Sequence, residues 1–230
     1  MSEGNRKRFG AASGILMIGL GAAATAFERS PVTAADFAAN RSALVTQGML
    51  FLAGAAVSLW FLGSLRAYLL RAEGGTGRLS TVAFGAGVAW ATINMVAQAF
   101  QVGVASDPEG SAPEALLKTM SAVFTIANLP LAVMLVAVAV ISLRYHAFAI
   151  WLAWLAFAAA GAQSVLWVST VVDTGPLAVD GWLSFALYPF FLIWLLPATI
   201  VMIRGAGKPS GELTHMNVAT DEAAPVAPRL

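Results

Sequence analysis

The sequence of 230 residues contains no cysteine and only two histidines, His146 and His215. A chain without cysteine forms no disulfide, no zinc–thiolate or iron–sulfur site, and has no catalytic thiol. Only His146 lies beside an apolar run, so one chain offers no pair of buried axial ligands for haem. We therefore expect no cofactor.

Charged residues are also scarce. They make up 11% of the chain and hydrophobic residues 59%, against about 25% and roughly 45–50% in soluble domains. The 13 basic and 12 acidic residues leave a net charge of +1, which gives no electrostatic attraction for nucleic acid. This composition excludes a soluble globule, a disordered chain and a nucleic-acid-binding protein. It indicates an integral membrane protein whose first partner is the lipid bilayer.

Long uncharged stretches make up most of the sequence. About 20 apolar residues in a helix cross a hydrocarbon core of about 30 Å. Six stretches have such a length, and they are continuous rather than alternating, which favours helices over strands. They cover residues 9–27, 44–65, 79–105, 120–143, 147–172 and 182–203. We predict an all-α fold, a polytopic membrane bundle of six transmembrane helices over residues 1–204, with a disordered cytoplasmic tail over 205–230.

The positions of lysine and arginine predict the orientation of the bundle. If the N-terminus is cytoplasmic, the inner side holds Arg6, Lys7, Arg8, Arg66, Arg71, Arg78, Arg144, Arg204, Lys208 and Arg229, and the outer side holds Arg29, Arg41 and Lys118. Basic residues concentrate on the cytoplasmic side of membrane proteins. We therefore expect a multi-pass membrane protein with both termini in the cytoplasm.

The first stretch has two interpretations. Its basic start, Arg6-Lys7-Arg8, and the sequence Ala24-Thr25-Ala26 at its end are also typical of a signal peptide with a small-x-small cleavage site. We favour a spanning helix, because the uncharged run is long enough to cross the membrane. Cleavage would leave the orientation of the other five helices unchanged.

Amides are the main polar residues inside the stretches, which contain no charged residue and no histidine. That lack argues against proton coupling. Asn94, Gln98 and Gln101 recur at i, i+4 and i+7 on one face of the third helix, and Trp167 follows Gln163 at i+4 on the fifth. Both faces should point into the bundle. We favour a structural role, holding helix three against helix five; alternatively, these five residues form a ligand-binding cleft between the two helices.

No residues in the sequence suggest catalysis or a metal site. There is no Ser–His–carboxylate set, and the glycine-rich inner loop around residues 74–77 lacks the lysine and spacing of a P-loop. Pro130, Pro189 and Pro197 interrupt apolar stretches, and each should bend its helix because proline removes a backbone donor.

A resemblance to a known family rests on three features. Arg8-Phe9-Gly10 enters the first helix, an outer loop carries Asp36 and Asn40, and an arginine-bearing inner segment covers residues 65–71. In these features the chain resembles a family of small six-helix bacterial inner-membrane proteins described only as a domain of unknown function. The resemblance implies a six-helix fold and a multi-pass location in the bacterial inner membrane, and no activity.

Three functions therefore remain open. The first is a non-enzymatic accessory or assembly subunit that contacts other membrane-protein subunits, or further copies of itself, through its helices. The second is the binding or transport of a small apolar or zwitterionic compound, or of a lipid, through the amide-lined cleft. The third is an intramembrane enzyme, for which the sequence offers no catalytic group.

Overall fold

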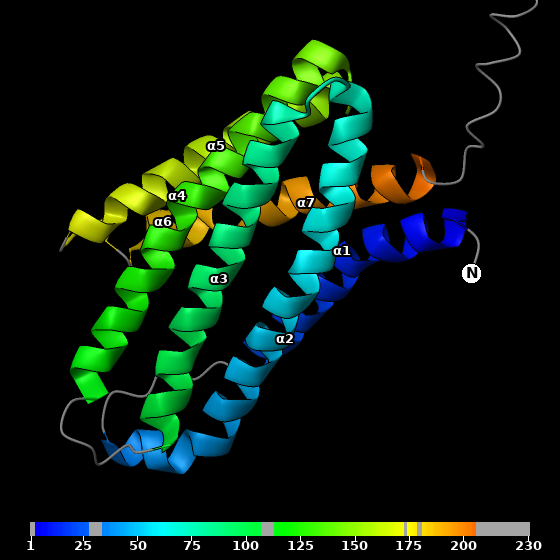
Figure 1. Ribbon diagram of the computed structural model, residues 1–230. Helices are drawn as coiled ribbons and strands as arrows, with labels where there is room; N and C mark the ends of the chain where they lie inside the picture. The colour runs from blue at the N-terminus through cyan, green and yellow to red at the C-terminus, as the bar shows by residue number, and fades with distance from the viewer. Residues whose placement is uncertain (1–2, 28–33, 107–112, 173, 179–180, 206–230) are drawn as a thin grey trace, which may run out of the picture.

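The computed structural model describes residues 3–27, 34–106, 113–172, 174–178 and 181–205, and within these ranges the chain is helical, without strands (Figure 1). The helices are α1 (Glu3–Thr25), α2 (Ala34–Glu73), α3 (Arg78–Ser106), α4 (Pro113–Tyr145), α5 (Ile150–Val168), the 3₁₀ helix η1 (Ser169–Val171), α6 (Trp182–Leu187) and α7 (Pro189–Gly205). The prediction of an all-α fold is confirmed for these residues. The expected disordered tail lies outside them, apart from Gly205, which ends α7.

The helices extend beyond several of the predicted stretches. The stretch 44–65 lies within α2, which begins at Ala34 and ends at Glu73. Hydropathy finds only the apolar part of a helix, whereas the polar residues on either side continue it because no proline intervenes. α2 ends before Gly74, whose φ of 64° suits the left-handed position that follows many helices.

The last predicted stretch, by contrast, is divided. α6 ends at Leu187 and α7 begins at Pro189, so the interruption coincides with one of the expected proline positions. Pro130 and Pro197 lie inside α4 and α7, and both helices continue through them. Of the three prolines, only Pro189 marks a helix boundary.

Five helical segments among the described residues are long and apolar enough to cross a membrane. They are Ala39–Glu73, Arg78–Ala105, Lys118–Tyr145, Ile150–Val171 and Trp182–Gly205. The apolar part of α1, Phe9–Thr25, is shorter. The structure is thus compatible with a membrane protein that has at least five spanning segments.

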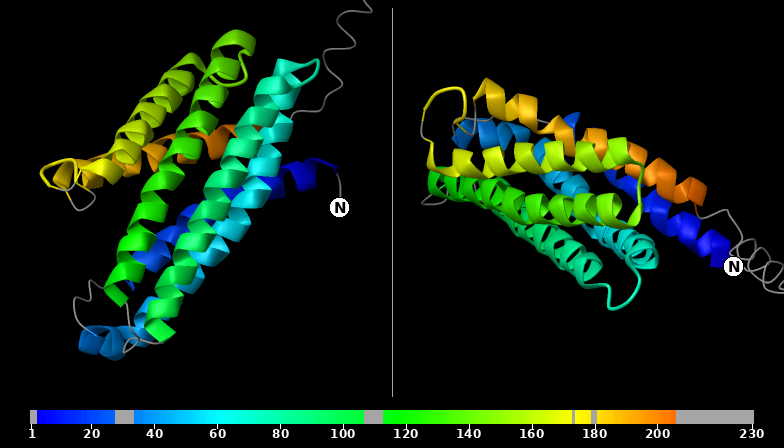
Figure 2. Two further views of the ribbon diagram at one scale, coloured as in Figure 1. Left: turned by 60° about the vertical axis from the view of Figure 1, so that its left-hand side comes forward. Right: turned by 90° about the horizontal axis from the view of Figure 1, so that it is seen from above.

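The helices are arranged as a closed ring. Each of α1, α2, α3 and α4 packs against the next helix in the chain, and α5 packs against α7. The ring closes where α7 packs against α1, so the first and last of the described helices lie side by side (Figures 1 and 2). α3 and α5 are therefore not neighbours, because α4 lies between them.

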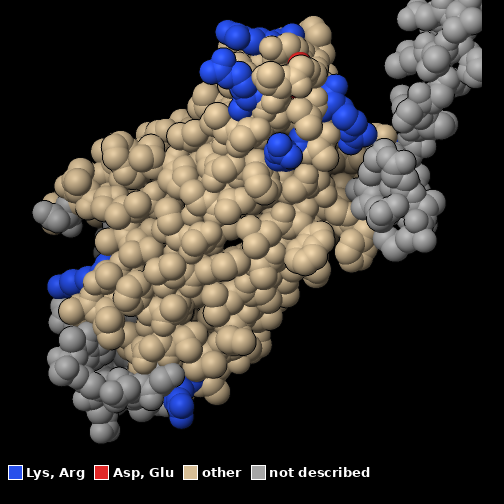
Figure 3. Space-filling view, viewed as in Figure 1, with Lys and Arg blue, Asp and Glu red and all other residues tan. Residues whose placement is uncertain are grey.

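One end of the ring carries most of the positive charge. Toward this end lie two turns, at 74–77 and 146–149, together with the beginning of α1 and the end of α7 (Figures 1 and 2). We call it the basic end, because it carries Arg66, Arg71, Arg78, Arg144 and Arg204. Figure 3 shows blue side chains gathered around it, with fewer at the opposite end.

The tight turn at the basic end is stabilised by Glu73. Its two carboxylate oxygens accept hydrogen bonds from the backbone N–H groups of Leu79 and Ser80, each at 2.8 Å. The first N–H groups of a helix have no partner within it, and a carboxylate there also interacts favourably with the helix dipole. The last residue of α2 thus caps the start of α3.

Loss of this cap should weaken the α2–α3 hairpin. We expect Glu73→Ala to lower the free energy of unfolding by about 1 kcal/mol, the usual effect of removing a helix cap. Thermal unfolding of the purified protein in detergent measures the effect. Glu73→Gln keeps one acceptor oxygen, so its melting temperature should lie between those of the wild type and Glu73→Ala. An unchanged melting temperature for Glu73→Ala would contradict the capping role.

Candidate functional site

A cavity of about 800 Å³ lies inside the ring of helices. Side chains from α1, α2, α3, α4, α5 and α7 line it, together with Tyr188 at the α6–α7 junction. Six of the lining residues are amides, namely Gln47, Asn94, Gln98, Gln101, Asn128 and Gln163. Five are aromatic, namely Phe51, Trp90, Phe124, Tyr188 and Phe191. The cavity thus combines apolar walls with several hydrogen-bonding groups, as small-molecule sites usually do.

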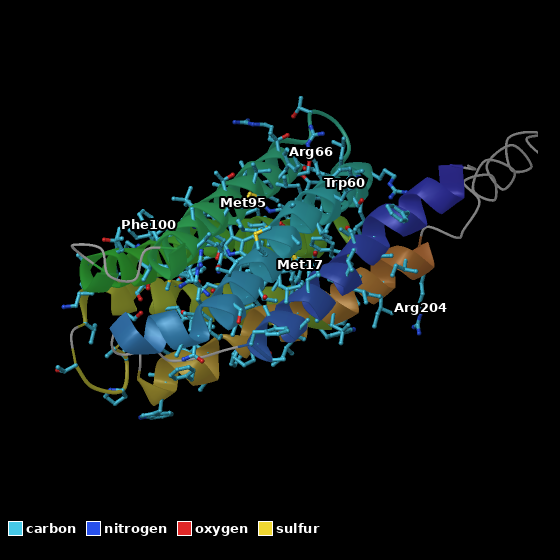
Figure 4. All side chains as sticks on the ribbon, turned by 90° about the horizontal axis from the view of Figure 1, so that it is seen from below. Met17, Trp60, Arg66, Met95, Phe100 and Arg204 are labelled. Carbon is cyan, nitrogen blue, oxygen red and sulfur yellow. The ribbon has the colours of Figure 1, made fainter. Side chains whose placement is uncertain are left out.

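The cavity occupies the half of the ring away from the basic end. The other half is filled by packed apolar side chains, among them Leu65, Leu69, Val138, Leu152 and Trp194. On α2, α4, α5 and α7 these core residues lie closer to the basic end than the cavity residues of the same helix. Figure 4 shows the direction of this axis, with Arg66 and Arg204 toward the basic end and Phe100 toward the opposite end.

Four of the five predicted site residues line this cavity. Asn94, Gln98 and Gln101 reach it from α3, and Gln163 reaches it from α5. Trp167 is not among the lining residues and is 41% exposed. Four residues turn a helix by about 400°, so Trp167 is rotated by about 40° from Gln163. The cavity therefore includes four of the predicted residues and excludes the fifth.

The hydrogen bonds of these amides differ from the expected ones. Gln101 Nε2 donates to Gln47 Oε1 at 2.7 Å and to the Leu44 carbonyl oxygen at 3.1 Å, both on α2. Asn94 Nδ2 donates to the Trp90 carbonyl oxygen on its own helix at 2.8 Å. The expectation that these two amides hold helix three against helix five is wrong, because α3 packs between α2 and α4 in the ring.

Two amide groups in the cavity have buried atoms without a hydrogen-bond partner. They are Gln98 Oε1 on α3 and Asn128 Nδ2 on α4, and their residues are only 3% and 6% exposed. Gly48 of α2 lies beside Gln98, because an added Cβ there would be in ordinary van der Waals contact with its Oε1 at 3.6 Å. Leaving a buried polar atom unpaired costs about 1–3 kcal/mol. Trp194 Nε1 and Thr199 Oγ1, whose residues do not line the cavity, are buried and unpaired in the same way.

Gln47 and Asn128 were missed as site residues by the sequence analysis. Each is an isolated amide in its stretch, whereas the predicted residues stood out by their spacing. The signal that could have found them is their residue type, because an amide within an apolar span needs a polar partner wherever it lies.

An aromatic cluster closes the cavity toward the packed core. The rings of Trp90 and Phe191 meet edge to face with centroids 5.4 Å apart, and those of Phe191 and Trp194 stack at 6.2 Å. Edge-to-face and offset stacked rings attract each other and define a rigid surface. Trp90 and Phe191 line the cavity, and fully buried Trp194 lies behind them.

The polar groups of the lining are almost all neutral amides. The described lining residues include no Asp, Glu, Lys, Arg or His, and Tyr188 is the one ionisable group among them. General acid–base and nucleophilic catalysis need a group whose proton moves near neutral pH. Over the described ranges, no three His, Cys, Asp or Glu side chains are grouped to hold a metal ion.

Comparisons of the chain with protein families, with curated proteins and with solved structures found no match.

Proposed function

We propose that this protein is a multi-pass protein of the bacterial inner membrane that binds a small uncharged molecule in the outer half of its bundle. Six helices cross the membrane and both termini are cytoplasmic, so the basic end faces the cytoplasm. The cavity then lies in the half of the bundle toward the outer leaflet. Its mixture of aromatic and amide side chains suits a molecule that is apolar with one or two polar groups.

The observation that carries this proposal is a cavity that brings six amide and five aromatic side chains together. Its volume of about 800 Å³ falls in the range of roughly 300–1,000 Å³ typical of small-molecule sites. Amide side chains from four helices, α2, α3, α4 and α5, reach this one space. A ligand with polar groups would find hydrogen-bonding partners there.

The position of α1 supports a retained first helix rather than a cleaved signal peptide. Gly10 lies against Ser64 of α2, and Gly14 lies against Thr199 of α7 and Phe61 of α2. Small residues allow such close helix contacts in membranes. Met17 and Thr25 of the same helix line the cavity. Cleavage after residue 26 would remove one wall of the site.

Gly21 provides a direct test of binding. It lines the cavity from α1, and an added Cβ would have no atom within 4 Å. Gly21→Leu should therefore fill part of the cavity without disturbing the packing of α1. We expect native mass spectrometry of the wild-type protein, extracted from its own membranes in mild detergent, to show a retained small molecule or lipid that Gly21→Leu lacks.

Gly19 supplies the matched control. It is on the same helix, is exposed and also has no atom within 4 Å of an added Cβ, but it does not line the cavity. Gly19→Leu should retain the same bound mass as the wild type. If all three proteins carry no small molecule and a protein subunit co-elutes instead, the accessory-subunit hypothesis replaces this proposal.

A further inference from the structure

We infer that the basic end binds an anionic phospholipid, whose phosphate lies between Arg71 and Arg204 beside the ring of Tyr68. This inference concerns the end of the bundle away from the cavity, so it goes beyond the proposed function and does not depend on it. Three features carry it, namely the contacts of Tyr68, the excess of positive charge and the level of the exposed tryptophans.

Tyr68 of α2 connects three segments of the basic end. Its hydroxyl donates a hydrogen bond to the Ala147 carbonyl oxygen at 2.8 Å, and its ring stacks on Phe148 with centroids 4.8 Å apart. An added Cβ at Gly205, the last residue of α7, would lie 3.6 Å from Tyr68 Cε2. The last turns of α2 and α7 and the turn after α4 therefore meet at this side chain.

Two exposed arginines are brought together by these contacts. Arg71 Cζ lies 5.8 Å from the centroid of the Tyr68 ring, a separation typical of a cation–π contact. Arg71 Nε also donates to the Ala67 carbonyl oxygen at 3.1 Å. Arg204 directly precedes Gly205, so α7 brings it close to the same ring (Figure 4). A guanidinium group that is already held loses less conformational freedom when it binds an anion.

The basic end has little negative charge of its own. The segments that meet there, residues 3–8, 66–78, 144–149 and 204–205, contain eight arginine or lysine residues and two glutamates. Glu73 is the one carboxylate among the described side chains, and both of its oxygens accept hydrogen bonds from the start of α3. The excess positive charge therefore favours an anion from outside the chain. Phosphate suits the planar fork of arginine, which can donate two parallel hydrogen bonds to it.

The level of the arginines favours a phospholipid over a soluble anion. Arg71 lies in the last turn of α2 and Arg204 is the second-last residue of α7, so both lie at the ends of segments long enough to span the membrane. Trp151 and Trp154, at the start of α5, are 56% and 61% exposed. Exposed tryptophans are typical of the level where headgroups meet acyl chains, and basic residues beside them attract anionic headgroups.

The test identifies the lipids that the full chain retains. The protein is placed in nanodiscs with equal amounts of phosphatidylglycerol and phosphatidylcholine, and native mass spectrometry identifies the bound lipids. We expect the wild type to retain several-fold more phosphatidylglycerol than phosphatidylcholine. Arg71→Gln and Arg204→Gln should each bring the two lipids close to parity, whereas Arg71→Lys keeps the charge and should keep part of the preference. Because both arginines are exposed, the melting temperatures of these variants in phosphatidylcholine alone should match that of the wild type.

Two control variants test the place of binding. Arg41→Gln removes an exposed positive charge from the opposite end of α2 and should keep the lipid preference of the wild type. Gly21→Leu fills part of the cavity and should also keep it, because the lipid binds at the other end of the bundle.

Thermal unfolding in phosphatidylcholine nanodiscs distinguishes the lipid from a free phosphate. Glycerophosphoglycerol is the headgroup of phosphatidylglycerol without its acyl chains. We expect added phosphatidylglycerol to raise the melting temperature of the wild type by several degrees, and glycerophosphoglycerol at equal concentration to leave it unchanged.

The possible outcomes separate this inference from the proposed function. Equal retention of both lipids by the wild type, or an equal loss of preference in Arg41→Gln, would overturn the phospholipid site. Stabilisation by glycerophosphoglycerol would also overturn it, because the ligand would then be a soluble phosphate. Loss of phosphatidylglycerol in Gly21→Leu would place the lipid in the cavity, against this inference but in favour of the proposed function. If Gly21→Leu retains every mass that the wild type carries while Arg71→Gln loses phosphatidylglycerol, the proposed function fails and this inference is supported.

Discussion

Gly14→Leu is expected to prevent the ring of helices from closing. An added Cβ at Gly14 would lie 2.5 Å from Thr199 Oγ1 on α7 and 2.9 Å from Phe61 Cδ2 on α2. Thr199 and Phe61 are almost completely buried, so neither can move into open space. Overpacking of a core costs about 1–3 kcal/mol for a few added methylenes and more where the neighbours are fixed. We expect a loss of at least about 3 kcal/mol, or little folded protein.

The measurement is the yield of monodisperse protein after extraction, followed by thermal unfolding of whatever is recovered. Gly19→Leu adds the same side chain to the same helix at an exposed position with no neighbour within 4 Å. It should express and melt like the wild type. Equal behaviour of Gly14→Leu and Gly19→Leu would show that α1 does not pack between α2 and α7.

Gln101→Met should destabilise the bundle. Gln101 donates to Gln47 Oε1 and to the Leu44 carbonyl oxygen, and both acceptors would lose this bond. Each unsatisfied buried group costs about 1–3 kcal/mol in general, although hydrogen bonds between membrane helices average nearer 0.6 kcal/mol. We therefore expect a decrease of about 1–3 kcal/mol, or roughly 2–10 °C in melting temperature.

A double-mutant cycle with Gln47 isolates this interaction. Residues that share a hydrogen bond are not additive, because the second substitution removes a group that the first has already left unpaired. Gln47→Met with Gln101→Met should therefore cost less than the sum of the single variants. Additive effects, or a stabilising Gln101→Met, would contradict the bonding of α3 to α2 through these amides.

The helical regions were predictable because apolar runs in hydrocarbon have to satisfy their backbone groups within helices. The ends of α2 were not predictable, since hydropathy does not register the charged residues that continue the helix, such as Arg66, Arg71 and Glu73. The interruption at Pro189 had a local cause and was anticipated, whereas the continuity of α4 through Pro130 depends on its neighbours.

The candidate site was predictable only within each helix. Spacing showed that Asn94, Gln98 and Gln101 share a face, and the cavity lies on that face. The spacing did not show which helices flank α3. Gln163 was therefore expected to lie against the amides of α3, and Gln47 was overlooked. The order of helices around a ring depends on which surfaces fit, and a single helix period contains no such information.

The contact between α1 and α7 has a consequence for the synthesis of the protein. Thr199 covers part of the surface around Gly14, so α1 acquires its final neighbour only after the chain has been made as far as α7. At about 5–20 residues per second, α1 would wait roughly 10–40 s in the membrane with its glycine face uncovered. A chain that stops before α7 never covers that face, and it presents to membrane proteases and chaperones a helix surface that the finished protein conceals.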